Sequence, residues 1–120
     1  MLHTMLANLL FSFVALLSVA NNEASLVGTW RHDTKERTAV MKFGSDGSFH
    51  GTLATHGEVI WTSAGKWTLE GDKLHYLYTE SSSEKIPIGS LDDDLVVEIS
   101  SEHLLLKARN GSLYKYERVP

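Results

Sequence analysis

The sequence has 120 residues, of which 42% are hydrophobic and 22% charged, and it contains no cysteine. A chain of this length accommodates one domain with one hydrophobic core. The lack of cysteine excludes disulfide bonds, thiolate metal sites and a cysteine nucleophile. The formal net charge of −4 argues against a nucleic-acid partner, which would favour clustered Lys and Arg.

Residues 1–20 have the pattern of an export signal. They contain no Asp, Glu, Lys or Arg, fifteen of them are apolar, and they end in a small-x-small triplet at residues 18–20. This pattern predicts a signal peptide cleaved after Ala20, a domain over residues 21–120, and a secreted or periplasmic location. The alternative is an uncleaved membrane anchor with the domain facing outward, because a helix over the leader would span roughly 30 Å, the thickness of a bilayer core.

After the leader, apolar and polar side chains alternate between turn residues, and no window has the i, i+3, i+4, i+7 spacing of a helix. Alternation of this kind is typical of an all-β domain. The first expected strands cover residues 26–33, 38–43 and 48–55. The Ser-Asp-Gly sequence at residues 45–47 predicts a tight turn, because glycine tolerates the positive φ that such turns need.

Residues 58–69 predict one long strand. The residues of one parity in it are Val59, Trp61, Ser63, Gly65, Trp67 and Leu69. A bend or bulge near residues 64–65, where glycine lacks a Cβ, would let this strand curve. A hairpin that turns at residues 63–65 is the alternative.

A turn at residues 70–72 precedes a strand with Leu74, Tyr76 and Tyr78 on its inward face. Residues 86–88, Ile-Pro-Ile, predict an edge or short strand, since proline cannot donate a ladder hydrogen bond. The three aspartates at residues 92–94 predict a turn.

Strands are then expected at residues 95–99 and 104–109. Asn-Gly at residues 110–111 favours a type I′ hairpin into a last strand that carries residues 114–118. Eight or nine short strands joined by tight turns predict an antiparallel up-and-down barrel of about eight strands, because closure removes exposed sheet edges. A two-sheet sandwich is the alternative.

The expected inward-facing residues allow two interpretations. These residues are Met41, Phe43, Phe49, Leu53, Trp61, Trp67, Leu69, Leu74, Tyr76, Tyr78, Leu95, Val97, Leu104, Leu106, Tyr114 and Tyr116. They either fill the barrel completely, which we favour, or leave room for one small ligand. In the second case Trp61, Trp67, Tyr76 and Tyr78 would be the ligand-binding residues, because their rings combine an apolar surface with a hydrogen-bond donor.

The segment Leu-Val-Gly-Thr-Trp at residues 26–30 resembles the Gly-x-Trp signature of lipocalins. Residues 43–49, 65–67, 71–74 and 116–118 are similar to the corresponding parts of small bacterial lipocalin-like domains, so the resemblance covers about residues 26–118. Avidins also begin with a Gly-Thr-Trp strand, but their later tryptophan-containing strands do not match this chain.

The resemblance implies a specific closure of the barrel. Trp30, which follows Gly28 in the signature, would plug the closed end, and an arginine from near the end of the chain would stack over its ring. Arg118 is the matching candidate and Arg109 the second. A guanidinium over an indole contributes roughly 0.5–2 kcal/mol.

No catalytic or metal-binding arrangement is recognisable in the sequence. The histidines His32, His50, His56, His75 and His103 lack the spacing of metal ligands and are expected to be solvated. No Gly-x-Ser-x-Gly elbow and no carboxylate pair on one strand face occurs. We therefore expect no cofactor, no metal and no catalytic residues.

These observations predict an exported, non-catalytic barrel that binds a small, partly apolar ligand in the barrel or at its mouth. The alternative is a filled barrel that acts as an envelope interaction module and binds a protein partner. An uncharacterised hydrolase is the weakest alternative.

Overall fold

A computed structural model of the protein describes residues 23–120, and the predicted leader lies outside the described residues. After one helical turn at residues 23–26, eight strands follow one another along the chain. They are β1 (Gly28–Asp33), β2 (Arg37–Phe43), β3 (Ser48–Thr55), β4 (Glu58–Glu70), β5 (Lys73–Ser81), β6 (Leu91–Ile99), β7 (His103–Ala108) and β8 (Leu113–Arg118). The all-β prediction is confirmed. Within residues 23–120, no helix combines the length and the apolar character needed to cross a membrane.

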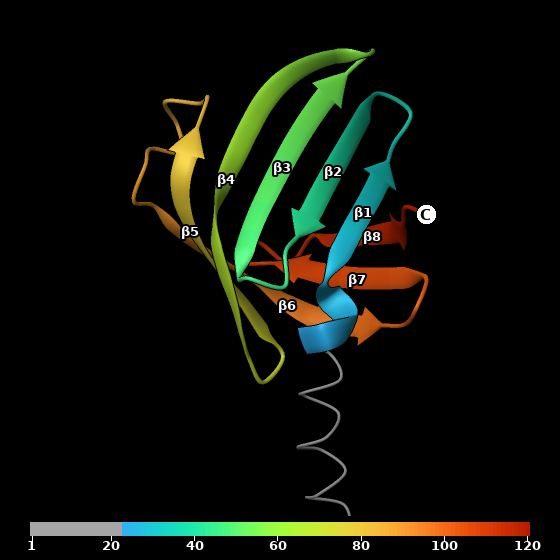
Figure 1. Cartoon of the computed structure of the whole chain (residues 1–120). Coiled ribbons are helices and arrows are strands. Elements are labelled where there is room, and N and C mark those ends of the chain that lie inside the picture. The colour runs from blue at the N-terminus through green and yellow to red at the C-terminus, as the bar shows by residue number, and fades with distance from the viewer. Residues whose placement is uncertain (1–22) are drawn as a thin grey trace, which may run out of the picture.

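The strands form a closed barrel in which each strand pairs antiparallel with the next (Figure 1). The last strand closes the barrel on the first, with Trp30 opposite Arg118 and Arg31 opposite Glu117. The up-and-down barrel is therefore confirmed, and the sandwich alternative is wrong. Closure pairs the first and last strands, which would otherwise be the free edges of the sheet.

Strand β4 is one continuous strand of 13 residues, so the hairpin alternative at residues 63–65 is wrong. Its register against β5 shifts between Ala64 and Gly65, where a bulge was predicted. A Cβ on Gly65 would lie 1.8 Å from the carbonyl oxygen of Leu77, so only glycine fits this close approach of two backbones.

Two predictions in the second half of the chain are wrong. Residues 86–88 lie in a loop of turns and bends rather than in a strand, so that eight of the expected eight or nine strands form. The aspartates at residues 92–94 belong to β6 rather than to a turn.

The prediction for the inward face of β6 is also wrong, because the residues of even number up to Val96 face inward instead of Leu95 and Val97. Val96 is 8% exposed, whereas Val97, which was expected to face inward, is 49% exposed. The register against β7 shifts between Val96 and Glu98, so that Ile99 again packs against the core. Three consecutive apolar residues at 95–97 contain no alternation, and the inward face could not be identified from them.

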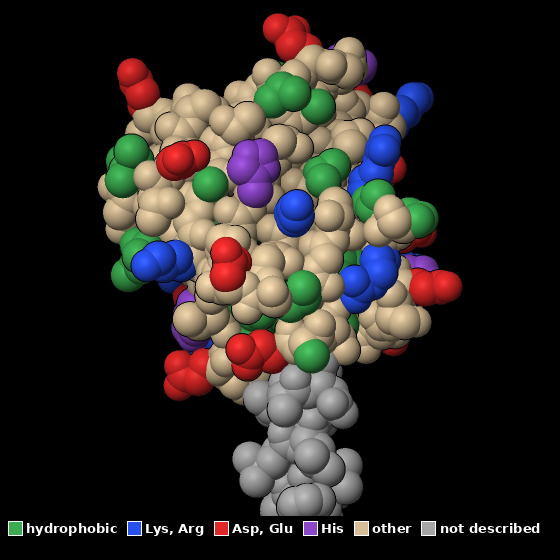
Figure 2. Space-filling model, viewed as in Figure 1, with side chains coloured by type: hydrophobic (Ala, Val, Ile, Leu, Met, Phe, Trp, Pro, Cys, Tyr) green, Lys and Arg blue, Asp and Glu red, His purple; other side chains and the backbone are tan. Residues whose placement is uncertain are grey.

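The buried core extends from the closed end toward the middle of the barrel. Its members are Leu26, Trp30, Phe43, Phe49, Trp67, Leu74, Tyr76, Tyr78, Val96, Leu104 and Leu106. The turns after β2, β4 and β6 lie at the closed end, next to the helical turn that precedes β1 (Figure 1). On the face of the molecule shown in Figure 2, apolar side chains are dispersed among charged ones.

Candidate functional site

The open half of the barrel contains a cavity of about 400 Å³. Its apolar and aromatic walls are formed by Ala39, Met41, Leu53, Trp61, Tyr76, Tyr78, Ile86, Leu106, Ala108, Tyr114 and Tyr116. Thr34 and Arg37, which are exposed, also line the cavity, so it reaches the protein surface. Side chains therefore fill the closed half of the barrel and leave the open half hollow.

Three of the four predicted ligand-binding residues line this cavity, namely Trp61, Tyr76 and Tyr78. The fourth, Trp67, does not. Its Nε1 donates a hydrogen bond to the carbonyl oxygen of Gly44 (3.1 Å), and its ring packs edge-on against Phe43 at 5.6 Å. Because a strand rises about 3.3 Å per residue, the separation of six positions between the two tryptophans places Trp67 roughly 20 Å from Trp61 along β4.

The aromatic wall is held by mutual ring contacts. The ring centroids of Trp61 and Tyr78 are 6.0 Å apart, and Phe49 packs edge-on against both Tyr76 and Tyr78 at about 5.5 Å. The indole Nε1 of Trp61 donates a hydrogen bond to the hydroxyl of Ser81 (3.1 Å). These contacts fix the orientation of the rings and give the cavity a preformed apolar surface.

Sequence reasoning missed two carboxyl groups in the cavity wall, those of Asp92 and Asp94. The hydroxyl of Tyr76 donates a hydrogen bond to Oδ2 of Asp94 (2.8 Å). Burial raises the pKa of Asp94, the hydrogen bond from Tyr76 opposes this shift, and the neighbouring Asp92 and Asp93 raise it further. Asp92, Asp94 and Val96 share one parity, but Asp93, Leu95 and Val97 share the other, so the sequence held no signal that could have placed the first set inward.

Three tyrosines of the cavity, Tyr76, Tyr78 and Tyr116, remain hydrogen-bond donors at neutral pH. Burial is the main cause that raises the pKa of Tyr78 to about 12, and it also raises those of Tyr76 and Tyr116. The charge of Asp94 adds to the shift at all three groups. A bound molecule would therefore meet neutral hydroxyl groups beside a carboxyl group.

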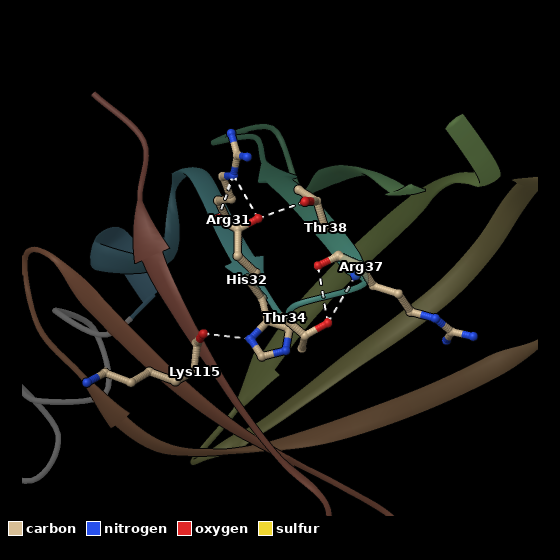
Figure 3. Close-up of polar contacts among 7 residues, drawn as sticks. Arg31, His32, Thr34, Arg37, Thr38 and Lys115 are labelled. Carbon is tan, nitrogen blue, oxygen red and sulfur yellow. Dashed lines mark hydrogen bonds and ion pairs between the residues drawn. The ribbon is translucent and has the colours of Figure 1, made fainter. Parts of the chain in front are cut away.

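One histidine, His32, lines the cavity, and its side chain is partly buried rather than fully exposed. Its Nδ1–H donates a hydrogen bond to the carbonyl oxygen of Lys115 (2.8 Å), as Figure 3 shows. Its ring packs against those of Tyr114 and Tyr116, with centroids 5.5 and 5.4 Å apart. Since a carbonyl only accepts, this contact requires the proton on Nδ1. In the part of the chain that the structure describes, no three His, Asp or Glu side chains gather as a metal site.

The rest of the network in Figure 3 ties β1 to β2 on the outside of the barrel. Asp33 accepts hydrogen bonds from Nε of Arg31 (2.9 Å) and from the hydroxyl of Thr38 (2.7 Å). Across the turn between the two strands, the hydroxyl of Thr34 accepts a hydrogen bond from the backbone N–H of Arg37 (3.0 Å). These contacts hold this part of the cavity rim in place.

At the closed end, Arg118 covers the ring of Trp30, with the guanidinium carbon 4.2 Å from the ring centroid. Trp30 is completely buried, and its Nε1 donates a hydrogen bond to the carbonyl oxygen of Leu26 (2.9 Å). Gly28 has a φ of +136°, and a Cβ there would lie 2.4 Å from Nη1 of Arg118. The second arginine candidate, Arg109, instead forms an exposed ion pair of 2.6 Å with Asp93.

Arg118 also satisfies backbone carbonyl groups at this end. Its guanidinium donates hydrogen bonds to the carbonyl oxygens of Ser101 (2.6 Å), Val27 (2.9 Å) and Ser25. The arginine therefore joins the turn after β6 to the segment that precedes β1. This cluster belongs to barrel closure and does not line the cavity.

Comparison with known proteins identifies a fold relative. No family profile matches the sequence, and no curated protein matches it. The structure is similar to that of a lipocalin-like protein from Bacteroides uniformis, with a TM-score of 0.60 and 16% identity over 79% of this chain and 99% of that one. Together with the closed barrel of eight antiparallel strands, this likeness shows that the chain has a lipocalin-like fold.

Proposed function

We propose that this protein binds a small, partly apolar molecule in the cavity of the barrel and performs no reaction on it. The observation that carries the proposal is the hollow of about 400 Å³ between Trp61, Tyr76 and Tyr78. Ligand pockets of proteins commonly measure about 300–1,000 Å³ and combine apolar walls with a few polar groups. The cavity has both properties.

The binding free energy would come from burial of the ligand against the aromatic wall. Removing apolar surface from water contributes about 25 cal/mol per Å². A ligand that buries ~200 Å² of apolar surface would gain about 5 kcal/mol before the entropy of association is subtracted. The hydroxyl groups of Tyr76 and Tyr78 would then orient the polar part of the ligand.

The face of the molecule shown in Figure 2 supports binding inside the barrel more than binding of a protein partner on that face. On the face shown in Figure 2, apolar and charged side chains alternate, and no continuous apolar patch covers that face. A docking surface for a protein would combine contiguous apolar area with a polar rim. The cavity is the more concentrated apolar surface.

We also propose that binding takes place outside the cytoplasm. The support for this is the leader at residues 1–20, which ends in a small-x-small triplet. The domain lacks cysteine, so its folding does not depend on disulfide formation in that compartment.

Intrinsic fluorescence tests the binding proposal, because Trp61 is the tryptophan that lines the cavity. Titration with fatty acids, retinoids and haem should quench or shift the emission for at least one of these classes. Trp61→Phe should remove most of that signal, whereas Trp67→Phe, at the closed end, should retain it. Absence of any change in fluorescence, together with no heat in calorimetric titrations of the same compounds and of neutral and cationic apolar molecules, would contradict the proposal.

A filled cavity provides a second test. Ala39 lines the cavity from β2, so Ala39→Phe should occupy part of the hollow and weaken binding at least tenfold. Circular dichroism checks that the variant remains folded. Unchanged affinity in a folded variant would place the ligand elsewhere.

A further inference from the structure

The negatively charged side chains that line the cavity lie deeper than the positively charged one. Asp92 and Asp94 project from β6 into the wall. The cationic side chain that lines the cavity is Arg37, which is exposed at the rim. The other titratable groups in the wall are His32 and three tyrosines, Tyr76, Tyr78 and Tyr116, together with the more exposed Tyr114. The interior is therefore acidic.

The two inward carboxylates differ in their protein partners. Asp92 lies 3.8 Å from Nε of Arg109, whose closer contact of 2.6 Å is with the outward-facing Asp93. Among residues 23–120, Asp94 forms no ion pair, and Tyr76 is the side chain that hydrogen-bonds it. Asp94 is thus a partly buried carboxylate without a cationic partner, in the wall of a hollow.

A carboxylate in this position makes the binding of a cation in the cavity more favourable than the binding of an anion. Its removal from water costs free energy that a hydrogen bond from one hydroxyl only partly offsets. A cation beside it would restore the lost interaction, and a second anion would be repelled. The faces of Trp61, Tyr76 and Tyr78 attract cations as well, because their π-systems carry negative charge on the face.

From this arrangement we propose that the cavity selects amines: molecules with an apolar body and one protonated amino group, which pairs with Asp94. The inference rests on the proposed binding function and specifies its ligand class. The apolar body contacts the aromatic wall, and the ammonium group donates hydrogen bonds to the carboxylate oxygen that Tyr76 leaves free. Apolar carboxylates of the same size bind less tightly.

Three probes with one skeleton test the proposal: 4-phenylbutylamine, 4-phenylbutan-1-ol and 4-phenylbutanoate. Titration calorimetry at pH 7.5 should give the amine a Kd at least tenfold lower than that of the alcohol, with the carboxylate weakest. Asp94→Asn should remove the preference of the amine over the alcohol, so that the two Kd values become equal within about threefold. Glu98→Gln is the matched control, because it removes one charge from an exposed position of the same strand and should preserve the preference.

The outcomes separate the two proposals. Equal affinity for amine and alcohol, or a preference for the carboxylate, would overturn amine selection while leaving apolar binding intact. A preference for the amine that persists in Asp94→Asn would also overturn it, because the preference would then arise elsewhere. Failure of all three probes to bind, when a compound of another class does bind, would overturn amine selection alone. Failure of every compound would overturn both.

Discussion

The carboxyl group of Asp94, which we propose to favour the binding of amines, is unfavourable for folding at neutral pH. Burial raises its pKa above the ordinary value of 3.8, so the folded state binds the proton more tightly than the unfolded state does. The free energy of unfolding therefore decreases as the pH rises from below 3.8 through the raised pKa. At neutral pH the ionised group costs the protein stability.

Asp94→Asn should accordingly be at least as stable as the parent protein at pH 7. The amide oxygen can still accept the hydrogen bond from Tyr76, and the buried charge is gone. The advantage of the variant should shrink as the pH falls through the raised pKa of Asp94, and it should be largely lost below the ordinary value of 3.8, where the carboxyl group is protonated in both the folded and the unfolded protein. Urea unfolding at pH 7 and pH 3.5 measures both points. A large loss of stability at pH 7 would show that the carboxylate is needed for folding.

At the closed end, Trp30 is the residue with the largest buried side chain. Trp30→Ala should destabilise the protein by about 3–5 kcal/mol, because it removes a buried indole and leaves a cavity. Arg118→Met should cost about 1.5–3 kcal/mol, since three backbone carbonyls lose a charged donor. Chemical denaturation followed by circular dichroism provides both values. If Trp30→Ala hardly changes the free energy of unfolding, the indole does not stabilise the closed end of the barrel.

The sequence predicted the parts of the site that follow a regular pattern. Trp61, Tyr76 and Tyr78 were expected in the ligand wall because they lie on clear alternations. Asp92 and Asp94 were not, because three aspartates in succession look like a turn and the apolar run after them has no alternation. Whether a carboxylate points inward depends on the neighbouring strands, which a single sequence does not display.

At the scale of elements, β4 runs along the whole barrel and contributes to both ends. Trp61 lies in the cavity and Trp67 at the closed end, with the bulge near Gly65 between them. The length of this strand was predictable from the shared parity of most of its apolar residues between 59 and 69, and its curvature from Gly65. The difference in role between its two tryptophans was not, because parity defines a face of a strand and not a depth in the barrel.

Gly65→Ala tests the close approach of β4 and β5. A Cβ there would lie 1.8 Å from the carbonyl oxygen of Leu77, and backbone atoms yield less than side chains do. We expect a loss of more than about 3 kcal/mol or failure to fold. The control is Gly57→Ala, whose Cβ would meet no atom but whose φ is +81°, and which should cost about 1–2 kcal/mol. Equal costs for the two variants in urea unfolding would argue against the backbone clash.

At the scale of the whole molecule, the barrel is filled at one end and hollow at the other. The sequence favoured a completely filled interior, because the number of large aromatic residues seemed sufficient for it. Closure of eight strands distributes these residues unevenly: Trp30, Phe43 and Trp67 crowd the closed end, and β6 contributes two aspartates to the cavity wall from a segment where a turn was expected. The hollow follows from this uneven distribution.

The leader makes a prediction about the complete chain. Expressed from residue 1 in a host with a secretory pathway, the protein should be exported and cleaved after Ala20, so that the mature chain begins at Asn21. Intact-mass analysis of the exported protein measures the cleavage site. An unprocessed chain retained in the membrane fraction would support the anchor alternative.

The sequence by itself determined the strand-and-turn order and, through alternation and tight turns, the closed barrel. Both depend on neighbours along the chain, because side-chain alternation and turn geometry are local properties. The tertiary structure alone decided which end is hollow, which carboxylates face inward and how deep each aromatic ring lies. These depend on register across strands and on how side chains from distant segments share one interior, and a small shift in register exchanges the inside of a strand for its outside.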